Sequence, residues 1–270
     1  DGIGKLTFAS LARTTGATLR VDGVLGMGTA NQQVKFTASP SSTNGILGAW
    51  ATVGKEWAAY GGNGLFAFGS YSTGAESTWV DPVMNVKASA SQTLGNNRII
   101  NSLNLQAAGN VTVTVNAPTR VLSISSGGIL AGSADATGRT HTFNNGIVTV
   151  PSTYASSGAE LITTVHTGTL NFNSVIDESF SFTGTKSTSN STITGVSTTA
   201  GVIIGMRVEG LGITANTTVT GVTGTTVTLS NTPTTAGSTS LTFTSGNVGV
   251  TKTGNGLLVL NGTNHYLGKT

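Results

Sequence analysis

The sequence contains no cysteine, and only 9% of its 270 residues are charged. The absence of cysteine excludes disulfide bonds and thiolate metal sites. The net charge is +3, and the thirteen basic residues are scattered rather than clustered as a nucleic-acid backbone would require. We therefore expect no nucleic-acid partner. No run of about twenty apolar residues occurs, which predicts that nothing spans a membrane.

What the chain has instead is glycine, with 38 residues, and recurrent Val, Ile and Thr. Low charge alone would suit a low-complexity chain, but disordered chains are usually rich in charge and poor in β-branched residues. Few charges also suit stacked strands, in which Ser, Thr and Asn side chains bond to the same residue type one layer away. The composition therefore predicts an ordered all-β protein.

Short apolar strands between Gly/Asn turns recur along the chain. Near its end, Leu257–Leu260 lies between turns at 252–256 and 261–264. Four consecutive apolar residues predict a strand that other strands cover. Related segments occur at 102–105, 111–115, 121–124, 169–172 and 240–243. A spacing of roughly 17 to 26 residues is typical of one coil of a β-solenoid, so we predict a parallel β-helix of about ten coils.

The run 250–270 reads Val-Thr-Lys-Thr-Gly-Asn-Gly-Leu-Leu-Val-Leu-Asn-Gly-Thr-Asn-His-Tyr-Leu-Gly-Lys-Thr. It resembles the autotransporter-associated β-strand repeat, with Leu257 in place of Thr and Lys269 in place of the second Gly. More loosely, 57–64 and 100–105 are similar to large surface proteins of planctomycete- or verrucomicrobia-like bacteria that carry this repeat. The resemblance implies a right-handed parallel β-helix that is secreted or displayed at the cell surface, without catalytic residues.

Composition divides the chain into four regions. We predict an N-terminal β region with an aromatic-rich cap or first coils at 1–90, and β-helix coils at 91–185. A small antiparallel β module is inserted at 186–240, because evenly spaced short strands with single-Gly turns follow a polar hinge there. The terminal repeat coil covers 241–270, with 240–243 re-entering the stack. The sequence starts without Met and stops where the repeat expects another strand, so we expect a processed product or a piece of a longer chain.

All three tryptophans lie close together in the sequence, at Trp50, Trp57 and Trp79, with Tyr60 among them. One interpretation is a local aromatic core or a cap that closes one end of the stack. The alternative is a glycan-binding platform, because flat aromatic faces stack on sugar rings. These four residues are the candidate ligand-binding residues.

The sequence offers few residues for catalysis. Asp177 and Glu178 are the only adjacent acids, and neighbours in a strand point to opposite faces. The histidines, His141, His166 and His265, lack metal-ligand spacing, and we expect each to be solvated or stacked between coils. No Gly-x-Ser-x-Gly elbow occurs. We therefore predict no enzyme activity, no cofactor and no metal, while calcium held by turn carbonyls stays open.

The hypothesis from sequence is a non-enzymatic, extracellular structural protein. It is either a segment of a surface stalk or a subunit that joins end to end into a fibre by strand pairing, with itself as partner. The candidate self-association residues are Leu257, Leu258, Val259, Leu260 and Tyr266. The alternatives are a glycan-binding adhesin that uses 46–81, a polysaccharide-degrading β-helix enzyme that uses the acids, and a viral tail-spike origin.

Overall fold

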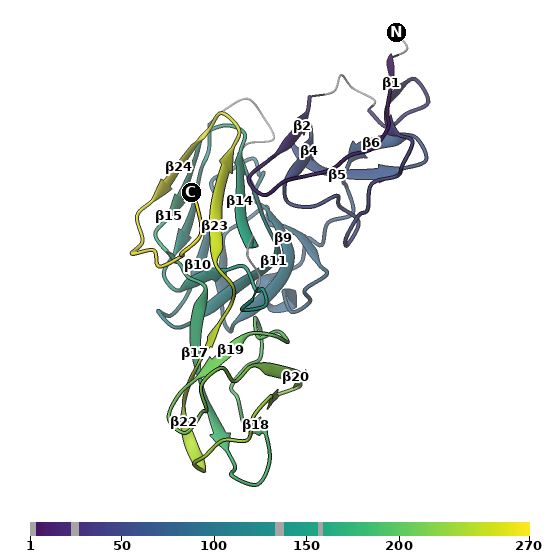
Figure 1. Ribbon diagram of the computed structural model, residues 1–270. Helices are drawn as coiled ribbons and strands as arrows, with labels where there is room; N and C mark the ends of the chain where they lie inside the picture. The colour runs from purple at the N-terminus through teal and green to yellow at the C-terminus, as the bar shows by residue number, and fades with distance from the viewer. Residues whose placement is uncertain (1–3, 23–26, 133–137, 156–158) are drawn as a thin grey trace.

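The computed structural model describes residues 4–22, 27–132, 138–155 and 159–270. Two parallel sheets form the centre of the protein, with an antiparallel sheet at one end and smaller N-terminal sheets at the other (Figure 1). Within the described ranges the one helical segment is the 3₁₀ turn η1 (Glu76–Thr78). No helix there is long and apolar enough to cross a membrane. The predicted all-β class is confirmed.

The two central sheets are built from parallel strand pairs. The five-stranded sheet has the order β24-β15-β12-β10-β8, with β8 (Gln92–Leu94), β10 (Thr112–Val115), β12 (Thr140–Asn144), β15 (Thr169–Phe172) and β24 (Leu257–Leu260). The seven-stranded sheet contains β7 (Asn85–Lys87), β9 (Arg98–Asn104), β11 (Val121–Ala131), β13 (Ile147–Thr149), β14 (Ala159–Val165), β16 (Val175–Ile176) and β23 (Val248–Thr253).

The chain alternates between these two sheets. It passes from β8 to β9, from β10 to β11, from β12 to β13 and β14, and from β15 to β16, and later from β23 to β24. Each return places a new strand beside the previous strand of the same sheet, and we call each such layer a rung. The first sheet is five strands deep in the described ranges. The predicted depth of about ten coils is therefore wrong, because residues 4–67 and 179–244 build other sheets.

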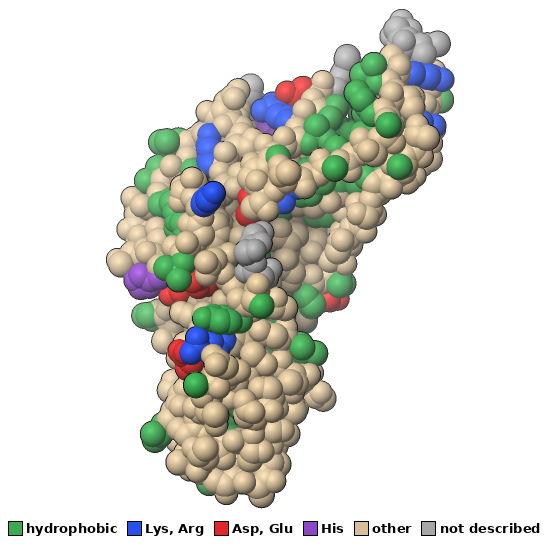
Figure 2. All heavy atoms as spheres, viewed as in Figure 1, with side chains coloured by type: hydrophobic (Ala, Val, Ile, Leu, Met, Phe, Trp, Pro, Cys, Tyr) green, Lys and Arg blue, Asp and Glu red, His purple; other side chains and the backbone are tan. Residues whose placement is uncertain are grey.

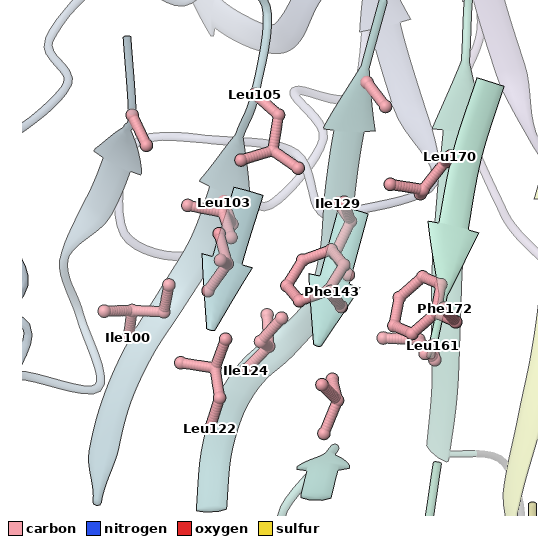
Figure 3. Packing of buried hydrophobic residues seen from close by; sticks show 14 of the residues in the cluster. Ile100, Leu103, Leu105, Leu122, Ile124, Ile129, Phe143, Leu161, Leu170 and Phe172 are labelled. Carbon is pink, nitrogen blue, oxygen red and sulfur yellow. The ribbon is translucent and has the colours of Figure 1, made fainter. Parts of the chain in front are cut away.

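The core lies between the two parallel sheets. Along β10 and β15 every second residue is buried, as a strand with one covered face requires. Phe143 and Phe172, from neighbouring rungs, stack with ring centroids 4.6 Å apart and an interplanar angle of 14°. Figure 3 shows side chains from the two sheets meeting in this core, among them Ile100, Leu103, Leu122, Ile124, Ile129, Phe143, Leu161, Leu170 and Phe172.

The antiparallel sheet has six strands and its own apolar core. They are β17 (Ser179–Lys186), β18 (Thr192–Thr194), β19 (Arg207–Glu209), β20 (Val219–Thr223), β21 (Thr226–Leu229) and β22 (Gly237–Thr244). The prediction of antiparallel structure here is confirmed, but the expectation that 240–243 re-enter the stack is wrong. Strand β22 pairs with β17 along eight residues, which places Leu241 and Phe243 against Phe180 and Phe182. The parallel ladder resumes at β23.

The N-terminal region forms two small sheets. Strand β1 (Gly4–Phe8) pairs with β3 (Gln32–Phe36) in parallel. The second sheet joins β2 (Leu19–Val21), β4 (Ala51–Val53), β5 (Glu56–Gly61) and β6 (Gly64–Ala67). Trp57 packs beside Leu130 and Ile162 of the seven-stranded sheet and belongs to a buried apolar cluster. A Cβ on Gly128 would lie 2.9 Å from the Trp57 ring, so this contact requires glycine.

Two histidines are buried rather than solvated. The Nδ1 atom of His141 accepts a hydrogen bond from the Val111 N–H at 3.1 Å, and its Nε2 lies 2.7 Å from the Gly132 carbonyl oxygen. Burial lowers the pKa of His141, which keeps this ring neutral. His166 is 3% exposed, and burial, with a further contribution from Arg20, lowers its pKa to about 4.

These two pKa values make folding stability dependent on pH. Between the ordinary histidine pKa of about 6.5 and the folded value, the unfolded chain binds protons that the folded chain does not. Stability is therefore fully present above pH 6.5 and falls as the pH drops. For His166 alone we expect a loss of about 2 kcal/mol between pH 7.5 and pH 5, measured by urea denaturation. The variant His166→Gln should lose correspondingly less stability over this pH range. An equally steep loss of stability in that variant would contradict the assignment of the pH dependence to His166.

Candidate functional site

One end of the five-stranded sheet is open. Strand β24 is its last strand, and within the described ranges no strand pairs with its outer edge. The N–H groups of Leu257 and Asn261 donate to the carbonyl oxygens of Gly168 and Phe172, each at 2.8 Å. Backbone groups alternate sides along a strand, so the N–H and C=O of Leu258 and of Leu260 point away from β15. The edge therefore presents unpaired donors and acceptors.

The apolar core is only partly covered at this open end, where Leu258, Leu260 and Tyr266 pack against it and are each partly buried. In the register of the sheet, Leu258 lies beside Leu170 and Leu260 beside Phe172. Leu170 and Phe172 are 0% exposed, whereas Leu258 and Leu260 are only partly buried. The difference arises because β15 has a strand on both sides, β12 and β24, whereas β24 has a neighbouring strand only on the β15 side. We call β23, β24 and residues 261–270 the terminal rung.

A ladder of asparagine side chains marks the same direction. The Nδ2 of Asn173 donates to Oδ1 of Asn144 at 2.8 Å, and Nδ2 of Asn261 donates to Oδ1 of Asn173 at 2.9 Å. Each rung thus donates to the rung before it, as in the asparagine ladders of stacked strands. The next acceptor in the series is Oδ1 of Asn261, at the open end. From the sequence, Asn261 is placed only in a predicted turn, and the ladder is not predicted because it depends on register.

The predicted acidic residues hold the terminal rung in place. The Glu178 Oε2 atom accepts hydrogen bonds from the N–H groups of Val248 at 3.1 Å and Leu267 at 3.2 Å. Asp177 Oδ2 lies 3.2 Å from Nδ1 of His265. The last residues then run beside β23, where the Val250 N–H donates to the Lys269 carbonyl oxygen at 2.8 Å. Both carboxylates therefore contact groups of the chain's own last segment.

The structure separates the four candidate ligand-binding aromatics. Trp57 and Trp79 are both 0% exposed and belong to different cores, so a sugar ring has no access to either indole. The Tyr60 hydroxyl accepts a hydrogen bond from the Phe36 N–H at 2.9 Å. Trp50 is partly exposed, and the Arg13 guanidinium lies 5.8 Å from its ring centroid. Trp50 is therefore the indole of this set that a ligand could reach.

Trp50 lines a cleft of about 430 Å³ between the N-terminal region and the seven-stranded sheet, which we call the Trp50 cleft. Its other lining residues include Arg13, Asn44, Ser125 and Glu160. Glu160 is buried, pairs with Arg13, and accepts 2.8 Å hydrogen bonds from the Gly16 N–H and the Thr251 hydroxyl. The cleft thus combines one aromatic face with polar side chains and a neutralised ion pair.

Comparison with known proteins assigns no role to any of these residues. No family model, curated protein or solved structure matches the chain. The resemblance to the autotransporter-associated repeat therefore stays a prediction. In the part of the chain that the structure describes, no group of three or more His, Asp or Glu side chains is placed to hold a metal ion.

Proposed function

We propose that this chain is a non-enzymatic structural protein, a β-solenoid whose terminal rung is covered by a further rung. That rung comes from a second copy in a fibre, or from the neighbouring repeats of a surface stalk. The observation that carries the proposal is the uncovered terminal rung, where Leu258 and Leu260 are half-covered and the strand edge is unpaired. The alternation of the chain between two parallel sheets supports the solenoid form of the proposal.

The proposal places the protein outside the cell. Three features support this location. The chain has no cysteine and few charges, so its stability depends on stacking rather than on disulfides or ion pairs. The terminal repeat resembles a motif of exported bacterial surface proteins. Stacked β-rungs also form extended structures by adding one repeat to the next.

A second copy can supply an exposed strand to this edge. All five residues of β1 are exposed, and apolar Leu6 and Phe8 alternate with Lys5 and Thr7. A strand of this pattern can add to a sheet edge by β-augmentation, with its apolar side chains directed onto the core. Pairing β1 of one copy with β24 of the next is a head-to-tail contact, which produces open filaments when it does not close into a ring.

The expected free energies of burial, hydrogen bonding and association predict a reversible assembly. Completing the burial of a few half-covered apolar side chains contributes roughly 1 kcal/mol each, and each new backbone hydrogen bond contributes about 1 kcal/mol. Association costs about 4–15 kcal/mol in lost translational and rotational freedom. The gain from one strand pair therefore falls within the range of this cost, so the net free energy of association is small. We expect self-association that rises with protein concentration.

A matched pair of lysine substitutions tests the proposal. Leu258→Lys places a charge in the half-covered core layer, where an added rung would bury it, whereas Leu257→Lys changes a side chain that is 58% exposed. Light scattering and negative-stain electron microscopy should show concentration-dependent filaments for the wild type and Leu257→Lys. Leu258→Lys should remain monomeric, and Leu6→Lys should weaken assembly from the other end. Wild-type protein that stays monomeric at millimolar concentration, or assembly of Leu258→Lys, would contradict the fibre form of the proposal.

The Trp50 cleft supports a second candidate function, binding of a neutral glycan. Trp50 offers an aromatic face, and the cleft volume of about 430 Å³ lies within the range of small-molecule sites. Asn44 and Ser125 supply polar groups beside it. We infer that a sugar ring stacked on Trp50 would fit this site.

Glycan-array binding and titration calorimetry test this candidate. Trp50→Ala should lower the affinity for a bound neutral oligosaccharide at least tenfold, and Ser125→Tyr should do the same by filling the cleft. Phe66→Ala is the control, because Phe66 is 37% exposed and lies outside the cleft lining. Absence of glycan binding by the wild type, or equal binding by all variants, would exclude the candidate.

A further inference from the structure

A second cleft, of about 520 Å³, lies where the parallel sheets meet the antiparallel sheet. One wall comes from the turns before β9 and β11 and carries Asn96, Asn97 and Arg120. The opposite wall comes from the antiparallel sheet region and carries hydroxyl groups, including those of Ser181 and Thr183. We call it the Arg120 cleft.

Arg120 is the one ionisable side chain among the described residues that line this cleft. Its Nη1 donates to the Leu94 carbonyl oxygen at 2.7 Å, which anchors the guanidinium at the cleft wall. A guanidinium has five N–H donors, so further donors remain for a ligand. No ion pair joins Arg120 to a carboxylate in the part of the chain that the structure describes. The cleft therefore carries a positive charge that no carboxylate of the described residues pairs with.

Asn97 adds an unused donor to the same wall. The side chain is 8% exposed, and its Oδ1 accepts a hydrogen bond from the Val121 N–H at 3.1 Å. This bond fixes which amide atom is oxygen, and the remaining Nδ2 has no hydrogen-bond partner. A buried donor without a partner is unfavourable, and an acceptor from a ligand would pair with it. Arg120 and Asn97 together favour an anion.

The opposite wall indicates what the anion is attached to. Hydroxyl groups of Ser181, Thr183, Ser197, Thr198 and Ser240 line the cleft, and each can both donate and accept. Such groups match the hydroxyls of a sugar ring. A volume of about 520 Å³ also exceeds what a small inorganic oxyanion needs and lies in the range of organic ligand sites.

We propose that the Arg120 cleft binds an acidic sugar residue of the uronate class. The carboxylate lies against the Arg120 guanidinium and the Asn97 amide, and the ring hydroxyls face the Ser and Thr side chains. Charge-assisted hydrogen bonds to arginine are the strongest contacts available to such a ligand. On the face shown in Figure 2, the charged side chains are few and scattered. This site goes beyond the proposed structural function, since it would attach the protein to acidic polysaccharide independently of rung stacking.

Ligand-observed NMR and titration calorimetry with sodium glucuronate, glucose and sodium sulfate test the proposal on the wild-type chain. Glucuronate should bind at least tenfold more tightly than glucose, because glucose lacks the carboxylate. Sulfate should compete with glucuronate weakly, because it lacks the ring. Glucuronate binding no tighter than glucose binding would overturn the proposal. Sulfate binding as tight as that of glucuronate would show an inorganic-anion site instead, which also overturns it.

Three variants assign the binding to this cleft. Arg120→Gln removes the positive charge. Asn97→Asp keeps the oxygen that accepts the hydrogen bond from the Val121 N–H but adds a negative charge. Each variant should weaken glucuronate binding at least tenfold. Arg120→Lys should retain most of it. Arg20→Gln is the control, because it removes the same charge from an exposed arginine outside the cleft. If Arg120→Gln does not fold, Asn97→Asp decides the test. Unchanged glucuronate binding in a folded Arg120→Gln or Asn97→Asp variant refutes the site.

Discussion

The contact between one rung and the next is the interaction on which this structure depends. Each strand of the five-stranded sheet has three to five residues, too little surface to bury its own side chains. Stacking supplies the missing cover, as Phe143 on Phe172 and the Asn144, Asn173 and Asn261 ladder show. The low charge content follows from the same constraint, because side chains that face their own kind one layer away must be neutral. Where the stacking stops, at β24, the core is left half-covered.

The other sheets pack against this stack, and both clefts lie along their boundaries with it. The N-terminal region contacts the seven-stranded sheet through Trp57, and the Trp50 cleft lies at that junction. The antiparallel sheet leaves the stack after β16, and the Arg120 cleft lies beside it. Stacked rungs provide a stable support but few cavities, because their interior is filled. The two proposed ligand sites therefore depend on the attached regions, while the proposed assembly depends on the stack.

Much of the fold could be predicted from local patterns. The apolar segments at 111–115, 169–172 and 257–260 correspond to strands of one parallel sheet, because the apolar pattern of each strand is encoded in the segment itself. Pairing over long sequence distances could not be predicted. Strand β22 resembles a rung strand but pairs with β17. The same limit applies to the site residues, because their surroundings come from neighbours that are distant in sequence. This holds for the burial of Trp79 and His166, for the unused donor of Asn97 and for the asparagine ladder.

Amide hydrogen exchange at β24 tests the central claim most directly. In dilute protein the amides of Leu258 and Leu260 point away from β15 and should exchange rapidly, whereas those of Leu257 and Val259 should be protected. Raising the protein concentration should protect Leu258 and Leu260 and leave the other two unchanged, because an added rung pairs with the outer edge. If Leu258 and Leu260 exchange equally fast at all concentrations, or are already protected in dilute monomer, the claim that a further rung covers the terminal rung is contradicted.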